Sequence, residues 1–383
     1  MPQETLTSRE RVIRTLRRES VDRMPIDLGC HFSTGISAFA YWHLREYLGL
    51  STDAIWVPDV VQFLAYVDED ILQRFHCDCM LLYPRWREPM RWSPRPPYAF
   101  TLPASLDPET TADGDIIVRQ GERSMRLPQG GYFFDGDWLS EWRGLDPEDH
   151  LALYAREAER IHRETDYATM LMYGFGAYFG DIEWQMEATM DPEAVMAKNE
   201  VALERSSERM GRVIDSMGDH IQMVCINADM GFQNGPMCRP SLMERVTMPY
   251  IKRFCEFVHR NSDIKVFHHC CGSIKPLIPM LIDAGVDVLN PVQISAGNMD
   301  PHELKAEFGD DIIFWGGGAN TQYVLGVGSP EEVRANVTEL VTAFKPGGGF
   351  VFNQVHNIMG DVPPENIVAM LDTAYELAFY QDE

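Results

Sequence analysis

Basic residues are scarce in this sequence. Among 383 residues, 33 are lysine or arginine and 58 are aspartate or glutamate, so the formal net charge at pH 7 is −25. A chain without an excess of cations has little with which to neutralise a phosphate backbone, which argues against nucleic acid as a partner. The same charge keeps copies of a protein apart through mutual repulsion.

Long apolar segments are missing as well. The first residues, MPQETLTSRER, are polar and lack the apolar core of a signal peptide. The run nearest to a membrane span, residues 167–180, is too short and too rich in glycine. We therefore expect a cytoplasmic protein with no membrane partner. Hydrophobic residues make up 45% of the chain, enough for the core of one large α/β domain.

Disulfides are not expected, although the chain has eight cysteines. A chain of this length without an export signal rarely uses cysteine as a disulfide framework. The adjacent Cys270 and Cys271 of VFHHCCG could pair with each other only in a strained ring. In FHCDCM, Cys77 and Cys79 share a strand face, but no other Cys or His clearly completes a site with them, so buried thiols are expected there.

Eight short runs, apolar on both faces, alternate with helical patterns. This alternation predicts a (β/α)₈ or TIM barrel, with a doubly wound open sheet as the alternative. The expected strands are 24–29, 78–84, 168–174, 221–229, 264–270, 286–292, 311–317 and 349–355. The main expected helices are 191–217, 240–261, 273–284, 300–308, 330–344 and 363–379, and Thr7-x-x-Glu10 predicts a capping box ahead of another.

Residues 85–150 interrupt the alternation. A proline-rich stretch with four arginines is followed by short runs separated by glycine turns, which predicts antiparallel strands. We interpret this segment as a β-rich insertion after the second strand, within a single barrel domain of residues 1–383. It is either a lid over the barrel mouth or a surface meander, and its Trp86, Trp92 and Tyr98 would suit contact with a substrate or partner.

Half of a zinc site is visible at the end of the fifth expected strand. Because side chains alternate along a strand, His269 and Cys271 share one face, while His268 and Cys270 share the other. An imidazole and a thiolate are suitable zinc ligands. They would lie at the carboxyl end of a barrel strand, which is the end where such barrels have their active sites. The alternative for the pair alone is a histidine and a small thiol packed in a core.

Further ligands must come from other strand ends. His356 follows the eighth expected strand, Asp229 ends the fourth, and Glu183 follows the third. Together with the His-x-Cys pair they predict a metal site, with zinc favoured over magnesium. Asn290 and Gln293, at the end of the sixth strand, are expected to orient ligands or bind substrate. Each residue alone has the alternative of capping a loop.

The glycine-rich stretch FWGGGANTQ (314–322) is a weak candidate for ligand binding. It lacks a helix that begins directly after the glycines, as a phosphate cradle would require. Close approach of the backbone to a ligand explains the glycines equally well. We expect Asn320, in this stretch, to contact the substrate.

Four pieces of the chain resemble the uroporphyrinogen decarboxylase superfamily. They are RERVIRTLRRESVDRMPID, HHCCGSIKPLIPMLIDAGVDVLNPVQ, WGGGANTQYVLGVGSPEEVRANV and VHNIMGDVPPENIVAM. The resemblance covers most of the chain outside 85–150 and implies a (β/α)₈ barrel. It also implies one of two activities: the metal-free decarboxylation of haem synthesis, or zinc-dependent methyl transfer to or from a corrinoid.

The motifs favour the methyltransferase branch. Decarboxylases of the superfamily carry an arginine-rich RQAGR-type segment after the first strand, whereas this chain reads LGCHFSTGISAFAYW there, without arginine. The methyltransferases carry an H-x-C-G zinc motif, which residues 269–272 match. Their third ligand is usually a cysteine after the last strand, and His356 occupies that place here.

The resemblance thus implies a zinc-dependent methyltransferase that acts on a methyl ether, methylamine or thiol, as an O-demethylase does. It implies zinc bound by His269, Cys271, His356 and either Glu183 or Asp229, with Asp229 and His356 in catalytic roles. A separate corrinoid protein is the expected partner, and both monomer and homodimer remain open. The alternatives are porphyrinogen decarboxylation, using Asp229 or Asp27 with His356, and a tetrapyrrole-binding barrel without chemistry.

Overall fold

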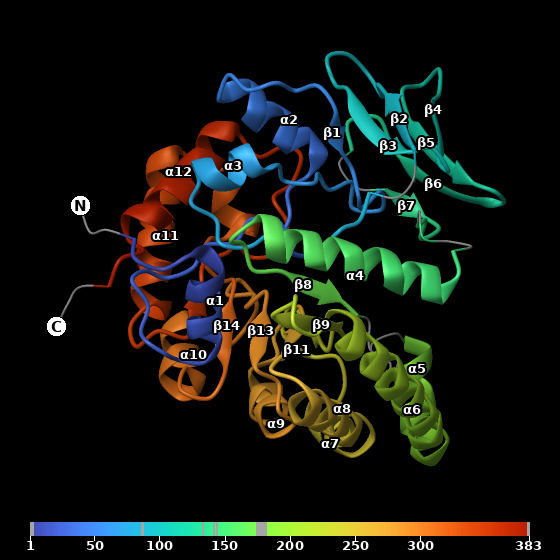
Figure 1. Ribbon diagram of the computed structural model, residues 1–383, viewed down its shortest axis with the longest axis vertical. Coiled ribbons are helices and arrows are strands. Elements are labelled where there is room, and N and C mark those ends of the chain that lie inside the picture. Colours follow the sequence, from blue (N-terminus) through green and yellow to red (C-terminus); the bar gives the residue numbers. More distant parts are fainter. Residues whose placement is uncertain are drawn as a thin grey trace.

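The structure is a computed structural model, and it describes residues 4–85, 88–131, 134–140, 142, 145–173 and 182–380. At its centre are six short parallel strands in the spatial order β15-β14-β13-β12-β9-β8 (Figure 1). Buried residues predominate in all six, as expected for parallel strands covered by helices. Their bounds are β8 Met170–Met172, β9 Met223–Asn227, β12 Lys265–His269, β13 Val288–Asn290, β14 Ile313–Trp315 and β15 Phe350–Val351.

Two further segments pair with the edges of this sheet. Ile26 forms a parallel bridge with Phe352, next to β15, and Cys79 forms one with Ala168, next to β8. The two segments also touch each other, because the Asp78 amide donates to the Ile26 carbonyl at 2.7 Å. All eight runs expected as strands therefore contribute to parallel pairing, which confirms an α/β fold with a parallel sheet.

Most of the expected helices are present. Three agree closely with the expected ranges: α6 (Pro192–Met217), α10 (Pro301–Phe308) and α11 (Pro330–Phe344). The last, α12 (Pro364–Glu376), ends three residues earlier than expected. Further described helices are α1 Ser8–Leu16, α2 Ala38–Tyr47, α3 Glu69–Arg74, α4 Pro147–Glu164 and α5 Ile182–Met190, with a short π-helical turn, η2, at Thr321–Leu325.

Two expected helices are divided. The range 240–261 forms α7 (Pro240–Val246) and α8 (Met248–Asn261), with a break at Thr247. Pro249 lies in the first turn of α8, where its missing N–H is tolerated, whereas inside a continuous helix it would remove a backbone hydrogen bond. The range 273–284 shortens to a 3₁₀ turn, η1 (Lys275–Leu277), and α9 (Ile278–Asp283), each with proline at its start.

The predicted capping box at the start of α1 is confirmed. The Thr7 side chain accepts from the Glu10 amide, and the Glu10 carboxylate accepts from the Thr7 amide at 2.9 Å. One turn later, Arg11 is fully buried and its guanidinium pairs with Asp78 at 2.6 Å and with Asp22 at 2.7 Å. Helix α1 is therefore attached to the segment that precedes Cys79 by buried ion pairs.

Antiparallel strands occupy much of the range 85–150. The sheet β4-β5-β6-β7 is antiparallel throughout, and β2 pairs antiparallel with β3, which also pairs with β1. Figure 1 shows β2 to β7 grouped at one corner of the molecule, away from the parallel strands. Trp86 lies outside the described residues. The bounds are β1 Ile55–Trp56, β2 Pro89–Trp92, β3 Phe100–Pro103, β4 Asp107–Thr110, β5 Ile116–Gln120, β6 Arg123–Leu127 and β7 Asp135–Gly136.

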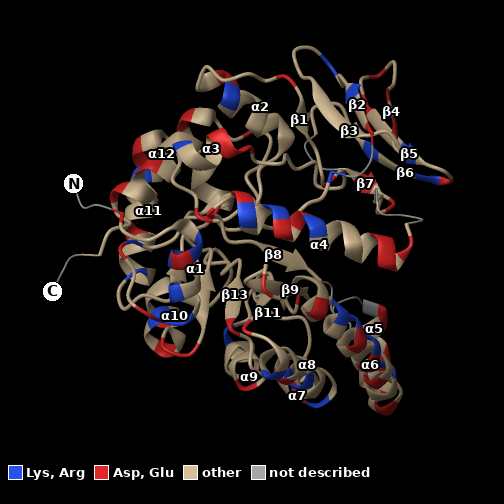
Figure 2. Cartoon of the chain, viewed as in Figure 1, with Lys and Arg blue, Asp and Glu red and all other residues tan. Residues whose placement is uncertain are grey.

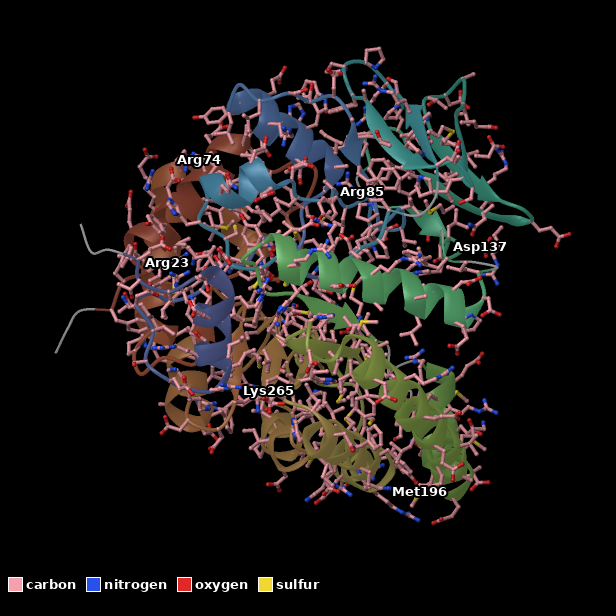
Figure 3. All side chains as sticks on the ribbon, in the orientation of Figure 1. Arg23, Arg74, Arg85, Asp137, Met196 and Lys265 are labelled. Atoms are coloured by element: carbon pink, nitrogen blue, oxygen red, sulfur yellow. The ribbon has the colours of Figure 1, made fainter. Side chains whose placement is uncertain are left out.

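Charged side chains are distributed over the outside of the molecule. Figure 2 shows acidic and basic residues mixed along the helices around the parallel strands. Some charged side chains are buried instead. Arg23 is 1% exposed and pairs with Asp78, and Figure 3 shows it near the side where both chain ends emerge. Among the described residues, no helix is both long and apolar enough to cross a membrane.

Candidate metal centre

Three of the predicted ligands lie together at the carboxyl ends of the parallel strands. His269 is the last residue of β12, Cys271 follows it in the next loop, and His356 lies beyond β15. One ligand atom from each lies within 4.8 Å of the other two. Cys271 Sγ is 3.5 Å from His269 Nε2, and the two imidazole centroids are 5.5 Å apart.

Asn290 determines how the His269 ring is presented. The two residues are paired directly between β12 and β13, and His269 Nδ1 lies 2.6 Å from Asn290 Oδ1. The amide nitrogen of Asn290 donates to the Trp315 carbonyl at 2.9 Å, so its oxygen must be the atom that faces the imidazole. His269 Nδ1 is then the donor, and Nε2 presents its lone pair toward Cys271.

The loop that carries Cys271 is held by hydrogen bonds that its backbone amides donate. The Cys271 amide donates to Asp229 Oδ1, the Gly272 amide to Gln293 Oε1 and the Ser273 amide to the Phe232 carbonyl, each at 2.8 Å. Gly272 has a φ of +93°, and a Cβ there would lie 2.3 Å from the backbone of Gly231. Glycine is therefore required for the hairpin of β10 (Gly231–Phe232) and β11 (Gly235–Pro236) to pack against the loop.

Burial sets the protonation of the three residues. It lowers the pKa of His269 below its usual range and that of His356 to about 4, so both imidazoles are neutral at pH 7. Burial and the nearby Asp229 carboxylate raise the pKa of the Cys271 thiol well above its usual range. Neutral imidazoles can bind a cation directly, whereas the thiol must first release its proton.

A cavity of about 580 Å³ opens beside this group, and His269 and His356 are part of its wall. The Asp229 side chain also borders it, is 52% exposed and lies 3.9 Å from His269 Nε2. No lysine or arginine of the described part of the chain lines it. The remaining polar wall residues are Ser33, Asp59, Gln62, Ser140 and Asn227, and the larger apolar ones are Phe32, Trp138, Trp142, Met172 and Met237.

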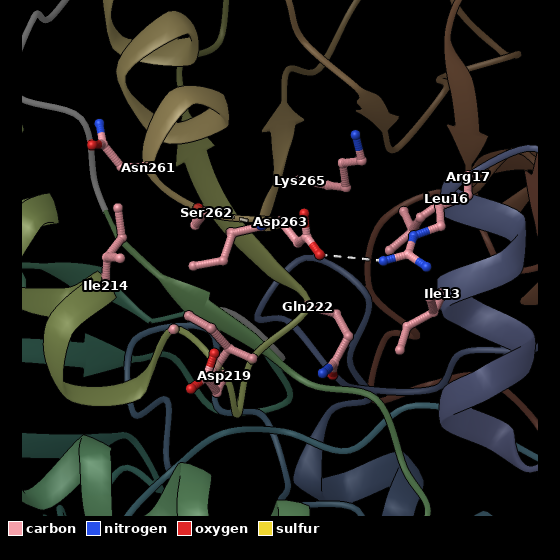
Figure 4. Close-up of a pocket in the computed structure, with 13 residues that line it drawn as sticks. Ile13, Leu16, Arg17, Ile214, Asp219, Gln222, Asn261, Ser262, Asp263 and Lys265 are labelled. Carbon is pink, nitrogen blue, oxygen red and sulfur yellow. Dashed lines mark hydrogen bonds and ion pairs between the residues drawn. The ribbon is translucent and has the colours of Figure 1, made fainter.

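A different cavity lies at the opposite ends of the strands. It measures about 290 Å³ and is formed where β9 and β12 begin, against Leu16 and Arg17 at the end of α1 (Figure 4). Arg17 reaches across it to Asp263 at 3.4 Å. This cavity contains none of the residues predicted for the site, so the cavity beside His269 is the candidate for binding a substrate.

Other predicted site residues do not join the cluster. Glu183 is exposed in the first turn of α5 and is not part of the group of three, so its role as a ligand stays a prediction. Asn320 uses its side-chain oxygen to accept the Gln322 and Tyr323 amides at the start of η2. Neither Asn320 nor Gln293 lines the cavity within the described residues.

Sequence reasoning missed His31 and Asp59. His31 is 1% exposed, its ring centroid is 5.8 Å from that of His269, and its Nδ1 accepts the Ser33 amide at 3.0 Å. Asp59 lines the cavity and accepts hydrogen bonds from the Val61 and Gln62 amides. Both lie in loops after the first strand segment, where no spacing pattern marks them; the only available signal was a histidine directly after an expected strand.

Comparisons with known proteins point to one family. The family model for uroporphyrinogen decarboxylase (URO-D) matches residues 182–377. Curated uroporphyrinogen decarboxylases from Psychromonas ingrahamii and Neisseria gonorrhoeae are 35% and 24% identical over 80 and 150 residues, or 21% and 38% of this chain. These matches span 22% and 39% of the relatives' own lengths.

Among the solved structures that match is a methyltransferase from Methanosarcina mazei. Its TM-score is 0.58 and its sequence identity 16%, and the match covers 97% of this chain and 99% of that one. Similarity at this level of identity shows a shared fold.

Proposed function

The chain belongs to the uroporphyrinogen decarboxylase family, and within it we propose a zinc-dependent methyltransferase that moves a methyl group between a small methylated compound and a corrinoid protein. The observation that carries this proposal is the convergence of His269, Cys271 and His356, whose ligand atoms lie within 4.8 Å of one another beside a cavity. Two imidazoles and one thiol are donors typical of zinc.

The three residues fit a zinc ion in other respects. His269 is already oriented by Asn290, as ligating histidines are by a partner on the second ring nitrogen. The ring nitrogens of His356 have no hydrogen-bond partner among the described residues, so they are available. When bound, zinc would act as a Lewis acid on the methyl-bearing heteroatom or would activate a thiol acceptor. Three protein ligands leave a coordination position for that atom.

The surrounding residues have separate roles in this proposal. Phe32, Trp142 and Met172 give the cavity an apolar wall that excludes water from a small methylated substrate. Asp229 Oδ1 holds the amide of Cys271 in place, and the proton that the Cys271 thiol loses on zinc binding would leave to solvent. In each turnover the same carboxyl group would pass a proton from solvent to the leaving group.

We further propose that the parallel strands close into a (β/α)₈ barrel over residues 1–383, with 85–150 as an insertion bordering its mouth. The pairing of the segments around Ile26 and Cys79 with β15, β8 and each other supports this. The corrinoid protein would dock over the carboxyl ends of the strands. All eight cysteines are free thiols, which suits the reducing cytoplasm that a cob(I)amide also needs.

Decarboxylation of a porphyrinogen is the second candidate, because the curated relatives carry that name. A porphyrinogen with eight carboxylates needs cations in its site, and no lysine or arginine of the described residues lines the cavity. Asp27, a candidate acid for this reaction, is fully buried and bonded to Trp315, so it does not reach a substrate. These observations favour methyl transfer.

The test supplies a reduced corrinoid protein with a methyl ether, a methylamine or a methyl thioether and follows the absorbance change from cob(I)amide to methylcob(III)amide. We expect the corrinoid to be methylated with at least one donor. The Cys271→Ala variant should lose this activity and should also lose one zinc ion per chain. Cys270→Ala is the matched control, because that thiol accepts the Met230 amide and is not part of the cluster. Full activity in metal-free protein, or equal zinc loss in both variants, would refute the proposal.

A further inference from the structure

A second group of possible metal ligands lies inside the molecule, apart from the site described above. Asp27, Cys30 and Cys79 are each 0% exposed, and one ligand atom from each lies within 4.8 Å of the other two. The Asp27 carboxylate accepts from the Cys30 amide at 3.0 Å, the Cys30 thiol at 3.2 Å and Trp315 Nε1 at 2.9 Å. None of these residues belongs to the group of His269, Cys271 and His356.

No cation of the described residues pairs with the Asp27 carboxylate. Its hydrogen-bond partners, which also include the Thr34 side chain, are all neutral, and no described lysine, arginine or histidine forms an ion pair with it. The other fully buried carboxylate nearby, Asp78, pairs with both Arg11 and Arg23. A buried carboxylate is stable only if it is protonated, paired with a cation or bound to a metal. Since two thiols surround Asp27, the metal is the alternative that uses all three side chains.

We propose that Asp27, Cys30 and Cys79 bind a second zinc ion in a structural role. Carboxylate and thiolate are both zinc ligands, and structural zinc takes four ligands, so one further donor would complete the site that these three side chains begin. Zinc would replace the two thiol protons, which leave to solvent. The Cys30 amide and Trp315 Nε1 keep their hydrogen bonds to the carboxylate and so support the ligand from behind.

The position of the cluster explains what such an ion would do. Asp27 and Cys30 belong to the first strand segment and Cys79 to the second, and these segments join the sheet through isolated bridges at Ile26 and Cys79 rather than through extended ladders. The backbone bond between them is that of the Asp78 amide to the Ile26 carbonyl. Zinc would cross-link the two segments where regular strand pairing is weakest.

Metal analysis of purified protein separates the two sites. We expect two zinc ions per chain in the wild type and one in each of Cys271→Ala and Cys79→Ser. Cys225→Ser is the matched control and should keep both, because Cys225 is buried in the same core but lies outside the cluster. A folded Cys271→Ala protein without zinc overturns this inference, and so does a Cys79→Ser protein with unchanged zinc.

Two further measurements keep the test decisive if Cys79→Ser does not fold. Asp27→Asn preserves the size of the side chain and should also lose one zinc. In Cys271→Ala protein loaded with Co²⁺, a thiolate-to-cobalt charge-transfer band should appear, and added zinc should raise the Tm. No band and no change in Tm contradict the second site. If Cys271→Ala instead keeps all the zinc of the wild type, the proposed methyltransferase site fails and this site remains.

Discussion

At the scale of single residues, the site depends on side chains that do not touch a substrate. Asn290 is fully buried, yet its oxygen fixes which nitrogen of His269 carries the proton. Its orientation is fixed in turn by the bond of its amide nitrogen to the Trp315 carbonyl on β14. The presentation of one imidazole is therefore set by two neighbouring strands.

Asn290→Ala should weaken zinc binding at His269 by about 10–100-fold, the usual effect of removing a partner behind a metal ligand. The His269 ring would lose the acceptor that holds its tautomer. Competition with a chromophoric chelator measures the affinity. Asn320→Ala is the control, because that side chain caps η2 instead of contacting the cluster, and it should bind zinc as the wild type does. Equal affinities in the two variants would contradict the role of Asn290.

His356→Ala should reduce zinc affinity by at least an order of magnitude, because it removes one of three ligands.

In the wild type, zinc affinity at this site should rise about tenfold per pH unit between pH 6 and 8. Both imidazoles have lowered pKa values and are already neutral there, so the proton released is that of the Cys271 thiol, whose pKa is raised. Zinc affinity independent of pH, or unchanged in His356→Ala, would remove these residues from the ligand set.

At the scale of elements, the buried ion network joins α1 to the sheet. Asp78 accepts from Arg11 at 2.6 Å, from Arg23 at 2.7 Å and from the Ile26 amide at 2.8 Å. These bonds connect the helix that packs at one end of the strands with the two segments that join the sheet only through isolated bridges. Removing one partner of a buried ion pair destabilises a protein, because the other partner is left charged and buried.

Asp78→Asn should lower the free energy of unfolding by about 3–5 kcal/mol, since two buried guanidinium groups lose their shared carboxylate. Urea unfolding followed by circular dichroism gives the value. Asp263→Asn is the control: its pair with Arg17 is exposed, with 95% and 52% of the two side chains accessible, and it should change little. A small effect at Asp78 would show that the network is not required for the fold.

At the scale of the whole molecule, charge limits the choice of substrate. The chain carries a formal charge of −25, and the described wall of the cavity adds Asp59 and Asp229 without a lysine or arginine. A polyanion would meet repulsion both on approach and in the site. A small methylated compound without multiple carboxylates meets neither.

Uroporphyrinogen should therefore not be converted to coproporphyrinogen by this protein, with or without zinc, and should not bind measurably at physiological ionic strength. Conversion is measured by chromatography of the porphyrin products after oxidation. Binding is measured by a fluorescence titration. An active uroporphyrinogen decarboxylase assayed in parallel is the positive control. Rapid decarboxylation by metal-free protein would establish the second candidate function instead.

Local sequence patterns predicted much of the fold. All eight apolar runs pair as parallel neighbours, and the capping box at Thr7 is present, because periodicity and capping depend on residues close in sequence. The break at Thr247 and the shortening after Ser273 were missed, although Pro249, Pro276 and Pro279 were visible. Proline permits a helix to begin as well as forbidding it to continue, and packing decides between these outcomes.

The candidate site shows the same division. The spacing of His269 and Cys271 follows from strand alternation and could be seen directly, and His356 could be anticipated from its place after the last strand. That Cys79 lies beside Asp27 and Cys30, and that His31 lies next to His269, were decided only by the tertiary structure. These contacts join segments that are far apart along the chain. The order of the strands and the course of the loops bring them together, and neither of these leaves a local pattern in the sequence.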